Sequence, residues 1–324
     1  MTETASKARV GRLFVVLGLV GRLTQPLSCS VGGGQKMLAL WTRRPRWPAL
    51  ITGLFALAMA PCVAAEPGVP AQPLARVHAD YHITWNGLDL GDFIWDSSIN
   101  SGKYKAATSA NISALFGAYT WEGATHANGT YVTGAPHPAN YKFKFNATDK
   151  SGQIVMGFAN DKVVSMTEDP PDRGSSGRIP LKPAHMENVL DPLSAIMALS
   201  SPGNGSIEGV NPCDKHLAVF DGRQRFDLVL SFKHKTRIDG GKGAKIAFVC
   251  QIQYVPIAGM KMNTETKYMA ATDGIEIWLA AVPAANAFVP VNVVIPTWAG
   301  SAQITSTRVQ IDMPGKGRIA LSSK

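Results

Sequence analysis

Residues 185–232 read HMENVLDPLSAIMALSSPGNGSIEGVNPCDKHLAVFDGRQRFDLVLSF, and this stretch predicts a short helix followed by a pair of strands. Asp191 is a suitable N-cap because its carboxylate can accept hydrogen bonds from the free amides of the first turn, and Pro192 occupies the position that needs no amide hydrogen. Pro202 and Gly203 end the helix after about two to three turns. Its apolar face consists of Leu193, Ile196, Met197 and Leu199.

The strand pair follows a polar loop. It runs over His216–Phe220 and Gln224–Phe232, with Asp221-Gly222 at the turn. Apolar and mostly polar side chains alternate along the second strand, which indicates one buried face and one wet face. The apolar set is Phe226, Leu228, Leu230 and Phe232.

The same alternation recurs along the chain on both sides of this stretch. Asn86-Gly87 and Asn128-Gly129 predict turns between strands, Asn263–Thr272 reads as a further strand, and the proline-rich segment Glu168–Pro183 reads as a loop. About a dozen strands and one helix predict a mainly β protein. We expect residues 75–324 to form a single domain: a curled antiparallel sheet, or half-open β-barrel, with one short central helix.

The net charge of +9 is concentrated at the N-terminus. Residues 1–65 contain 8 basic and 1 acidic side chains, which leaves 24 basic and 22 acidic for the rest of the chain. A folded domain that is nearly neutral overall gives no support to nucleic-acid binding, and we expect no nucleic-acid partner.

The basic N-terminal part contains an export pattern. Arg43, Arg44 and Arg46 precede the apolar run ALITGLFALAMA at residues 49–60, and small residues at 63–65 suit a signal peptidase. We expect a signal peptide over residues 37–65, an untranslated extension over 1–36, a disordered leader over 66–74, and a periplasmic protein. An uncleaved anchor is the alternative. Pro61 directly before Cys62 argues against a lipoprotein.

Four cysteines are present, of which Cys29 and Cys62 fall in the N-terminal segment. In an oxidising compartment the other two, Cys213 and Cys250, are most simply a disulfide. It would join the loop after the helix to the strand Lys245–Tyr254. Two free buried thiols are the alternative.

Four segments of the chain together resemble a known family. They are YHITWNGLDLG at 81–91, DPLSA at 191–195, LAVFDGRQRFDL at 217–228 and CQIQYVPIAG at 250–259. In this order and spacing they are similar to the bacterial cell-envelope family known as domain of unknown function 3108. The resemblance implies an exported all-β protein, akin in fold to the half-open sheets that carry lipoproteins or lipids through the periplasm. It implies no catalytic residues.

Catalytic and metal sites have weak support in the sequence. A hydrolase would use Ser194 with His185 and Asp191, but Ser194 lacks the G-x-S-x-G context and Asp191 is better explained as the helix cap. A metal would have to draw on His216 with Asp214, or on His234, and no histidine pair has a ligand spacing. We expect no catalytic centre, no metal and no cofactor.

A ligand site is expected between the concave face of the sheet and the helix, because such clefts hold apolar molecules. Arg223 and Arg225 could bind an anionic head group. A pairing of Arg225 with Asp227 on the same strand face is the simpler interpretation. The candidate ligand-binding residues are Arg223, Arg225, Phe226, Leu228, Met197 and Trp85.

These features favour a non-enzymatic periplasmic protein that binds a lipid-like or otherwise amphipathic envelope component. The first alternative is an interaction or scaffold protein of envelope assembly, which would bind a protein partner through the loop Glu168–Pro183 or an exposed sheet edge. The second is an envelope hydrolase that depends on Ser194.

Overall fold

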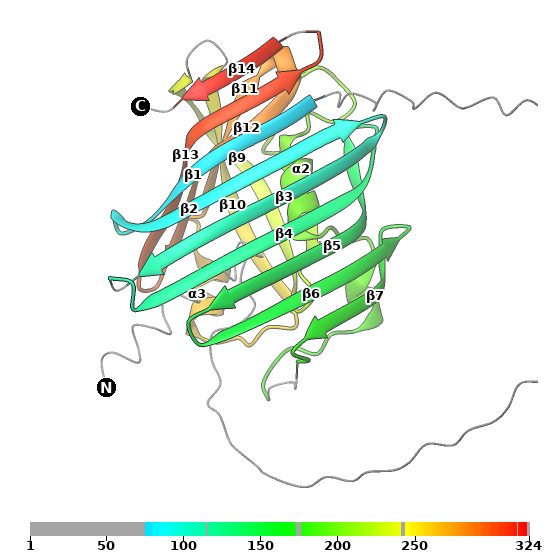
Figure 1. Cartoon of the computed structure of the whole chain (residues 1–324), viewed down its shortest axis with the longest axis vertical. Coiled ribbons are helices and arrows are strands. Elements are labelled where there is room, and N and C mark those ends of the chain that lie inside the picture. The colour runs from blue at the N-terminus through cyan, green and yellow to red at the C-terminus, as the bar shows by residue number, and fades with distance from the viewer. Residues whose placement is uncertain (1–74, 115, 173–175, 241–243, 316, 323–324) are drawn as a thin grey trace, which may run out of the picture. The chain divides into compact units, whose positions relative to one another are not determined.

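The computed structural model describes residues 75–114, 116–172, 176–240, 244–315 and 317–322. The described residues form one 14-stranded antiparallel sheet and include two short α-helices (Figure 1). The expected extension, signal peptide and leader over residues 1–74 lie outside the described residues, as does Cys62. None of the described helices is both long enough and apolar enough to cross a bilayer.

The first part of the chain is a run of seven strands, which two helical segments follow. The bounds are β1 Ala75–Trp85, β2 Leu88–Asn100, β3 Lys103–Ala114, β4 Tyr119–Val132, β5 Ala135–Ala147, β6 Lys150–Ala159, β7 Lys162–Asp169, the 3-10 helix η2 Pro183–Met186 and the helix α2 Pro192–Ser200.

The second part contains the remaining seven strands. Its bounds are β8 Lys215–Phe220, β9 Arg225–Gly240, β10 Ala244–Ala258, the helix α3 Thr264–Ala271, β11 Glu276–Val282, the 3-10 helix η3 Pro283–Ala285, β12 Ala287–Thr297, β13 Gly300–Met313 and β14 Gly317–Ser322.

The order of strands across the sheet is β7-β6-β5-β4-β3-β2-β1-β13-β12-β11-β10-β9-β8, with β14 paired to β13. The chain therefore builds two meanders, and the pairing of β1 with β13 joins them into one sheet. The sheet is not closed by hydrogen bonds, because β7 and β8 are its two ends. The expected curled, half-open antiparallel sheet is confirmed.

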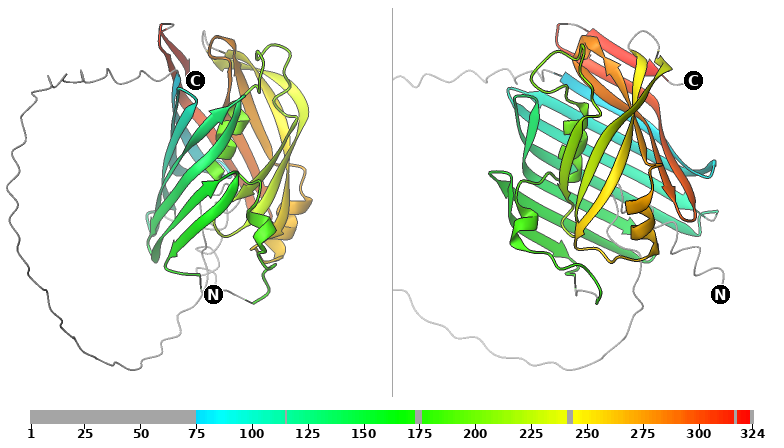
Figure 2. Two further views of the ribbon diagram at one scale, coloured as in Figure 1. Left: turned by 90° about the vertical axis from the view of Figure 1, so that its right-hand side faces the viewer. Right: turned by 180° about the vertical axis from the view of Figure 1, so that it is seen from behind.

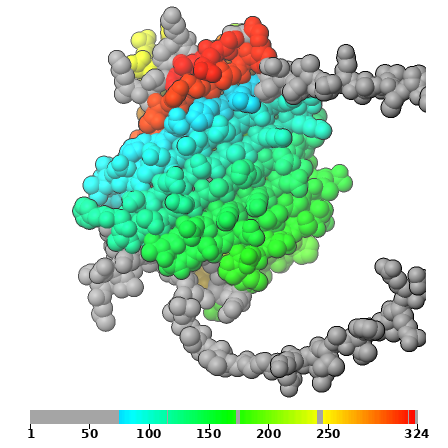
Figure 3. Space-filling view, viewed as in Figure 1, coloured from blue at the N-terminus to red at the C-terminus, as the bar shows by residue number. Residues whose placement is uncertain are grey.

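The sheet curls so that β2–β6 face β8–β12 across an interior, and α2 lies between them (Figure 2). The helix contacts β3, β4 and β5 on one side and β8 and β12 on the other. The second helix, α3, lies against β10 and β12. Alternate side chains of β3 and β4 point into this interior and are buried, while the others form the outer face (Figure 3).

The two end strands are connected through the segment Glu187–Leu190, which precedes α2. Glu187 forms an isolated bridge with Lys162 of β7, and the amide of Val189 donates to the carbonyl of Asp161 (3.2 Å). On the other side the amide of Leu190 donates to Ala218 of β8 (2.8 Å). The amide of Phe220 in turn donates to the carbonyl of Leu190 (2.9 Å), and Lys162 pairs with Glu187 (2.7 Å), so this extended segment is bonded to both ends of the sheet.

The turn between β8 and β9 packs on the opposite end of the sheet. At Gly222 (φ +94°) a Cβ would lie 2.5 Å from Cγ2 of Ile154 in β6, and at Gly259 (φ +87°) a Cβ would lie 1.9 Å from the carbonyl oxygen of Arg223. Both positions therefore require glycine, for space as well as for the positive φ. Arg223 also pairs with Glu168 of β7, and both side chains are largely buried.

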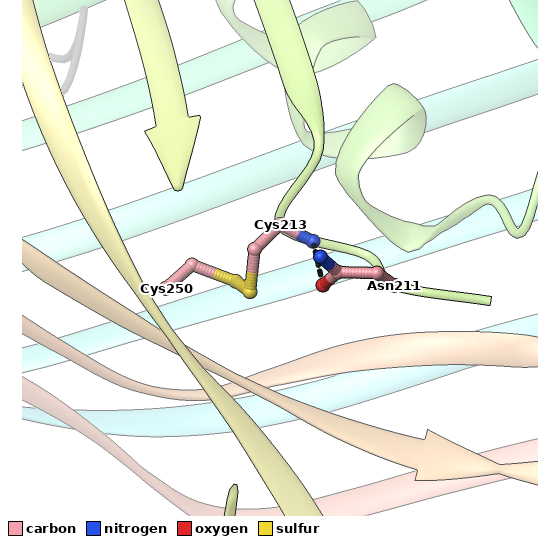
Figure 4. The surroundings of a disulfide bond; sticks show 3 residues. All are labelled: Asn211, Cys213 and Cys250. Atoms are coloured by element: carbon pink, nitrogen blue, oxygen red, sulfur yellow. Dashed lines mark hydrogen bonds between the residues drawn. A yellow bond between two sulfur atoms is a disulfide. The ribbon is translucent and has the colours of Figure 1, made fainter. Parts of the chain in front are cut away.

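Cys213 and Cys250 form a disulfide, which joins the loop before β8 to β10 (Figure 4). Both residues are fully buried. The amide of Cys213 donates to Oδ1 of Asn211 (3.1 Å), and this bond fixes the approach of the loop (Figure 4). The expected disulfide is confirmed.

The expected strand over Asn263–Thr272 is wrong: residues 264–271 form the helix α3. Asn263 is its N-cap, with Oδ1 accepting from the amide of Thr266 (2.9 Å), and Glu265 lies in the first turn, where a negative charge is favourable. Only Met269 of this helix is buried. The helix therefore has no apolar stripe that could have revealed it.

The expected turn at Asn128-Gly129 is also wrong. β4 runs through this pair to Val132 with a shift in its register against β5, and the chain turns at Thr133-Gly134, where both residues have positive φ. A β-bulge and a turn use the same residue types, so the dipeptide did not separate them. The sequence interpretation also lacked β14, which extends the sheet beside β13.

Candidate functional site

The inner face of β2–β5 contains a row of buried hydrogen-bonding groups that have no partner. Trp95, Thr108, Thr125 and Tyr141 are each at most 4% exposed. The indole Nε1 of Trp95 and the hydroxyls of the other three residues have no hydrogen bond with any described residue. A buried polar group without a partner costs about 1–3 kcal/mol, so a set of four in one place is unusual for a packed core.

The register of the sheet brings these residues together. Trp95 lies opposite Thr108, and Thr108 lies opposite Thr125, so three adjacent strands present polar groups side by side. The next inward-facing row continues to Tyr141. That row has small side chains on the three strands before the tyrosine: Ser97, Ala106 and Ala127. We call Trp95, Thr108, Thr125 and Tyr141 the interior polar row.

A chain of hydrogen bonds at the start of α2 lies beside this row. Oδ1 of Asp191 accepts from the amides of Leu193 (2.9 Å) and Ser194 (3.0 Å), which caps the helix. Oδ2 of Asp191 accepts from the hydroxyl of Ser194, so the hydroxyl of Tyr104 in β3 must donate to Ser194 Oγ, over 2.5 Å. The bond to Tyr104 fixes the N-terminus of α2 to the inner face of β3.

The carboxyl group of Asp191 is fully buried, and this burial raises its pKa to about 6 against the hydrogen bonds that lower it. Burial likewise raises the pKa of Asp221 to about 6, although the amides of Gln224 and Arg223 donate to its carboxylate. Leu190 and Val219 form a parallel bridge, and the two aspartates follow them closely in the sequence. Two carboxyl groups with raised pKa therefore flank the interior.

Tyr141 interacts electrostatically with both of these carboxyl groups. Burial raises the pKa of its phenol, and the charges of Asp191 and Asp221 raise it further. The pKa of Tyr254 in β10 is raised mainly by burial and then by Asp221. Both phenols are therefore neutral and able to donate a hydrogen bond at physiological pH.

The buried side chains of the interior favour an uncharged bound group. Among the described residues, those with buried polar or charged side chains are serines, threonines, Asn292 and Asp191, and they include no lysine or arginine. The largely buried basic side chains already have protein partners: Arg223 and Arg225 pair with carboxylates, and Nζ of Lys215 donates to the carbonyls of Ala198 and Ser201 at the end of α2. An anionic group in this interior would therefore meet the carboxyl group of Asp191 and cations that are already paired. The interior polar row is suited to an uncharged polar group, such as a hydroxyl, ester or amide, surrounded by apolar side chains.

The residues expected to bind a ligand line neither of two surface hollows among the described residues. Met197 and Phe226 are buried in the core, and Leu228 and Trp85 pack against it. Two surface hollows are lined by other residues, one over β1–β4 and one between α3 and the pair β9 and β10. Ligand binding by these residues stays a prediction.

The two arginines expected to meet an anionic head group are both in internal pairs. Arg223 pairs with Glu168, and Arg225 pairs with Asp227 while its Nη1 also donates to the carbonyl of Phe226 (2.6 Å). The simpler interpretation of Arg225 as a partner of Asp227 therefore describes its contacts. Both guanidinium groups are paired with carboxylates, although Nε of Arg223 has no hydrogen-bond partner among the described residues.

Of the residues considered for hydrolysis, the structure brings only Ser194 and Asp191 together by a hydrogen bond. Ser194 and Asp191 are hydrogen-bonded and buried, whereas Nδ1 of His185 accepts from the amide of Lys182 in η2 (3.1 Å). His216 pairs with Asp227 over 2.8 Å. In the part of the chain that the structure describes, no three His, Cys, Asp or Glu side chains are grouped as metal ligands.

The sequence interpretation missed the interior polar row. Thr108 and Thr125 stand 17 positions apart, and only the register of β3 with β4 makes them neighbours. The available signal was weak: each threonine stands at an inward position of its strand, where alternation calls for an apolar side chain.

Comparison with solved structures found a DUF1329 family protein from Desulfovibrio piger. It is 7% identical, the match covers 78% of this chain and 83% of that chain, and the TM-score is 0.19. No curated protein matches the sequence.

The family comparison agrees with the resemblance seen in the sequence. The model described as "Protein of unknown function (DUF3108)" matches residues 80–307, which run from β1 to β13 and include the interior polar row and α2. The chain therefore belongs to the DUF3108 family.

Proposed function

We propose that this protein is a non-enzymatic periplasmic binding protein that holds an amphipathic, lipid-like molecule inside the curled sheet, with the uncharged polar part of that molecule on the interior polar row. The observation that carries the proposal is the row itself. Four buried hydrogen-bonding groups that have no partner among the described residues lie in an interior lined largely by apolar side chains. A ligand that supplied partners for these groups would recover their desolvation cost.

The export pattern of the sequence supports a periplasmic location, where apolar molecules must cross an aqueous space. The apolar run at residues 49–60 follows three arginines and precedes small residues. The disulfide between Cys213 and Cys250 agrees with an oxidising compartment.

The connection between the ends of the sheet supplies a route for entry. β7 and β8 are not paired with each other, and the segment Glu187–Leu190 spans the gap. Separation of these ends would break no strand ladder, but it would break the buried pair of Arg223 with Glu168 and move the turn between β8 and β9 away from Ile154. The proposed ligand enters here.

Native mass spectrometry of protein purified from its own periplasm tests the proposal. We expect a bound small molecule that extracts into organic solvent and carries no phosphate or carboxylate. The double substitution Thr108→Val and Thr125→Val removes two hydroxyls at constant shape, and we expect it to lose the bound mass. Thr297→Val is the matched control, because the hydroxyl of Thr297 donates to the carbonyl of Gly300 (2.9 Å) at the turn between β12 and β13. Ligand-free wild-type protein, or equal retention by all variants, would contradict the proposal.

A second candidate function is that of an interaction protein of envelope assembly, and the edge strand β7 favours it. Val164 is 62% and Met166 is 45% exposed, and no strand of the described residues covers the outer edge of β7. An extended segment of another protein could pair with this edge. We expect Val164→Lys with Met166→Lys to abolish recovery of that partner in a pull-down, whereas deletion of the loop over residues 170–182 tests the loop separately.

A further inference from the structure

The last part of β9 and the first part of β10, where the chain passes from one strand to the next, have basic and apolar side chains next to one another. Residues 232–248 contain five Lys or Arg and one Asp, while the other residues of 66–324 contain 19 basic and 21 acidic side chains. The positive charge that remains beyond residue 65 is therefore concentrated in this hairpin. Figure 2 shows β9 and β10 on the side of the sheet opposite β2–β5.

The register places basic and apolar side chains next to one another. Lys235 lies opposite Phe248, and Arg237 lies opposite Ile246. Nζ of Lys235 stands 4.7 Å from the centre of the Phe248 ring, and Phe232 packs edge-on against the same ring at 6.4 Å. We call these five residues, Phe232, Lys235, Arg237, Ile246 and Phe248, the basic aromatic patch.

Four of the five patch residues are accessible to a partner, whereas Phe248 is half-buried and packs edge-on against the fully buried Phe288 (5.8 Å). Phe232 is 47% and Ile246 is 37% exposed, and Lys235 and Arg237 are exposed. Lys233 nearby is paired with Glu276 (2.6 Å), but within the described residues neither Lys235 nor Arg237 has an ion-pair partner. Two free cations thus stand among apolar side chains that water solvates poorly.

We propose that the basic aromatic patch docks on the surface of an anionic phospholipid membrane. Lysine and arginine near such a surface contribute about 1 kcal/mol each, and aromatic side chains at the level of the head groups add apolar contact. A flat interface suits an exposed hairpin face better than it suits a cavity. The inference extends the proposed function, since a carrier of lipid-like molecules must meet a membrane, but it depends on different residues.

Vesicle co-sedimentation of the full chain tests this inference. The probes are phosphatidylglycerol-containing vesicles and vesicles of phosphatidylcholine alone, at low and at high salt. Lys235→Gln with Arg237→Gln should lower binding to the anionic vesicles about 30-fold at low salt and should weaken its salt dependence. Phe232→Ser with Ile246→Ser should lower binding to both kinds of vesicle.

The matched control is Lys142→Gln with Lys144→Gln, which removes the same charge from exposed positions of β5. All variants keep the apolar run at residues 49–60, so any binding through that segment is common to them. We expect the control to bind within about twofold of wild type. Equal losses in both charge variants would show a general charge effect, and no loss in either would show that the patch meets another acidic partner. Each of these outcomes overturns the proposal.

The vesicle assay and the native mass spectrum can fail separately. Loss of vesicle binding in the patch variant with the interior ligand retained supports both proposals. Vesicle binding that ignores the patch, with the interior ligand still present, refutes only the membrane inference.

Discussion

At the scale of single residues, the unusual feature is that Thr108 and Thr125 stand where valine would fit. Both hydroxyls are buried, and neither has a hydrogen-bond partner among the described residues. A hydroxyl that faces only apolar atoms lowers stability, so these two threonines make sense only if something in the interior bonds to them. This reasoning leads to a prediction about the ligand-free protein.

In ligand-free protein we expect Thr108→Val and Thr125→Val each to raise the free energy of unfolding by up to about 1 kcal/mol, because the desolvation cost of a hydroxyl disappears. Thr297→Val should lower it by about 1–2 kcal/mol, since that hydroxyl is bonded to the carbonyl of Gly300. Urea unfolding of delipidated protein measures all three. Destabilisation by the first two as large as that by the third would show that the row is already satisfied.

Asp191 leads to a prediction about pH. Its pKa is about 6 in the folded protein and 3.8 in the unfolded chain, so the folded state binds this proton more tightly. The resulting stabilisation is complete below pH 3.8 and is lost as the pH rises through 6. Between pH 4 and pH 8 we therefore expect wild-type stability to fall by about 3 kcal/mol more than that of Asp191→Asn, which retains a capping oxygen. Urea titrations across this range measure the difference, and parallel curves would contradict the raised pKa.

At the scale of elements, the two helices show what a sequence pattern conveys. A capping aspartate, a proline and an apolar face predict the helix α2, and the structure has it at Pro192–Ser200. The helix α3 also has a capping residue, Asn263, but it buries one side chain and has no apolar period. Both helices have a capping residue, but only α2 has an apolar face, and this face made α2 predictable from the sequence.

Of two ion pairs, likewise, one could be predicted from the sequence and the other could not. The pairing of Arg225 with Asp227 could be read from neighbouring positions on one strand face. The pairing of Arg223 with Glu168 joins opposite ends of the sheet, and no sequence spacing points to it. Contacts of this kind depend on how the sheet curls, which alternation of side chains does not specify.

The pair of Arg223 and Glu168 should stabilise the junction of β7 with the turn between β8 and β9. Both side chains are largely buried, so Arg223→Met leaves an uncompensated carboxylate and should lower the free energy of unfolding by about 3 kcal/mol. Adding Glu168→Leu should restore most of this loss. A double-mutant cycle by urea unfolding measures it. If Arg223 bound an anionic ligand instead, Arg223→Met would cost binding and not stability.

The disulfide fastens the loop after α2 to β10. It closes a loop of 37 residues, for which the chain-entropy model gives about 4 kcal/mol. We expect Cys213→Ala with Cys250→Ala to lower the free energy of unfolding by about 3–4 kcal/mol while the β-sheet spectrum in circular dichroism is retained. An unchanged stability, or two reactive thiols in denatured protein taken from its natural compartment, would show that the bond does not form in the cell.

At the scale of the whole molecule, the curled sheet separates two chemistries. The inner face has neutral hydrogen-bonding groups within an apolar interior, and the distal hairpin of β9 and β10 has exposed cations among phenylalanines. The sequence predicted the sheet class and the central helix, because both depend on composition and local period, while the export pattern stays a prediction. It did not predict the interior polar row or the basic aromatic patch, because both require the register between strands.

The most direct measurement is a crystal structure of the protein isolated from its natural compartment. We expect continuous electron density for an elongated molecule in the interior, with an uncharged polar atom within hydrogen-bond distance of the hydroxyl of Thr108 or Thr125. An interior in which these hydroxyls meet only protein atoms and ordered water would contradict the account.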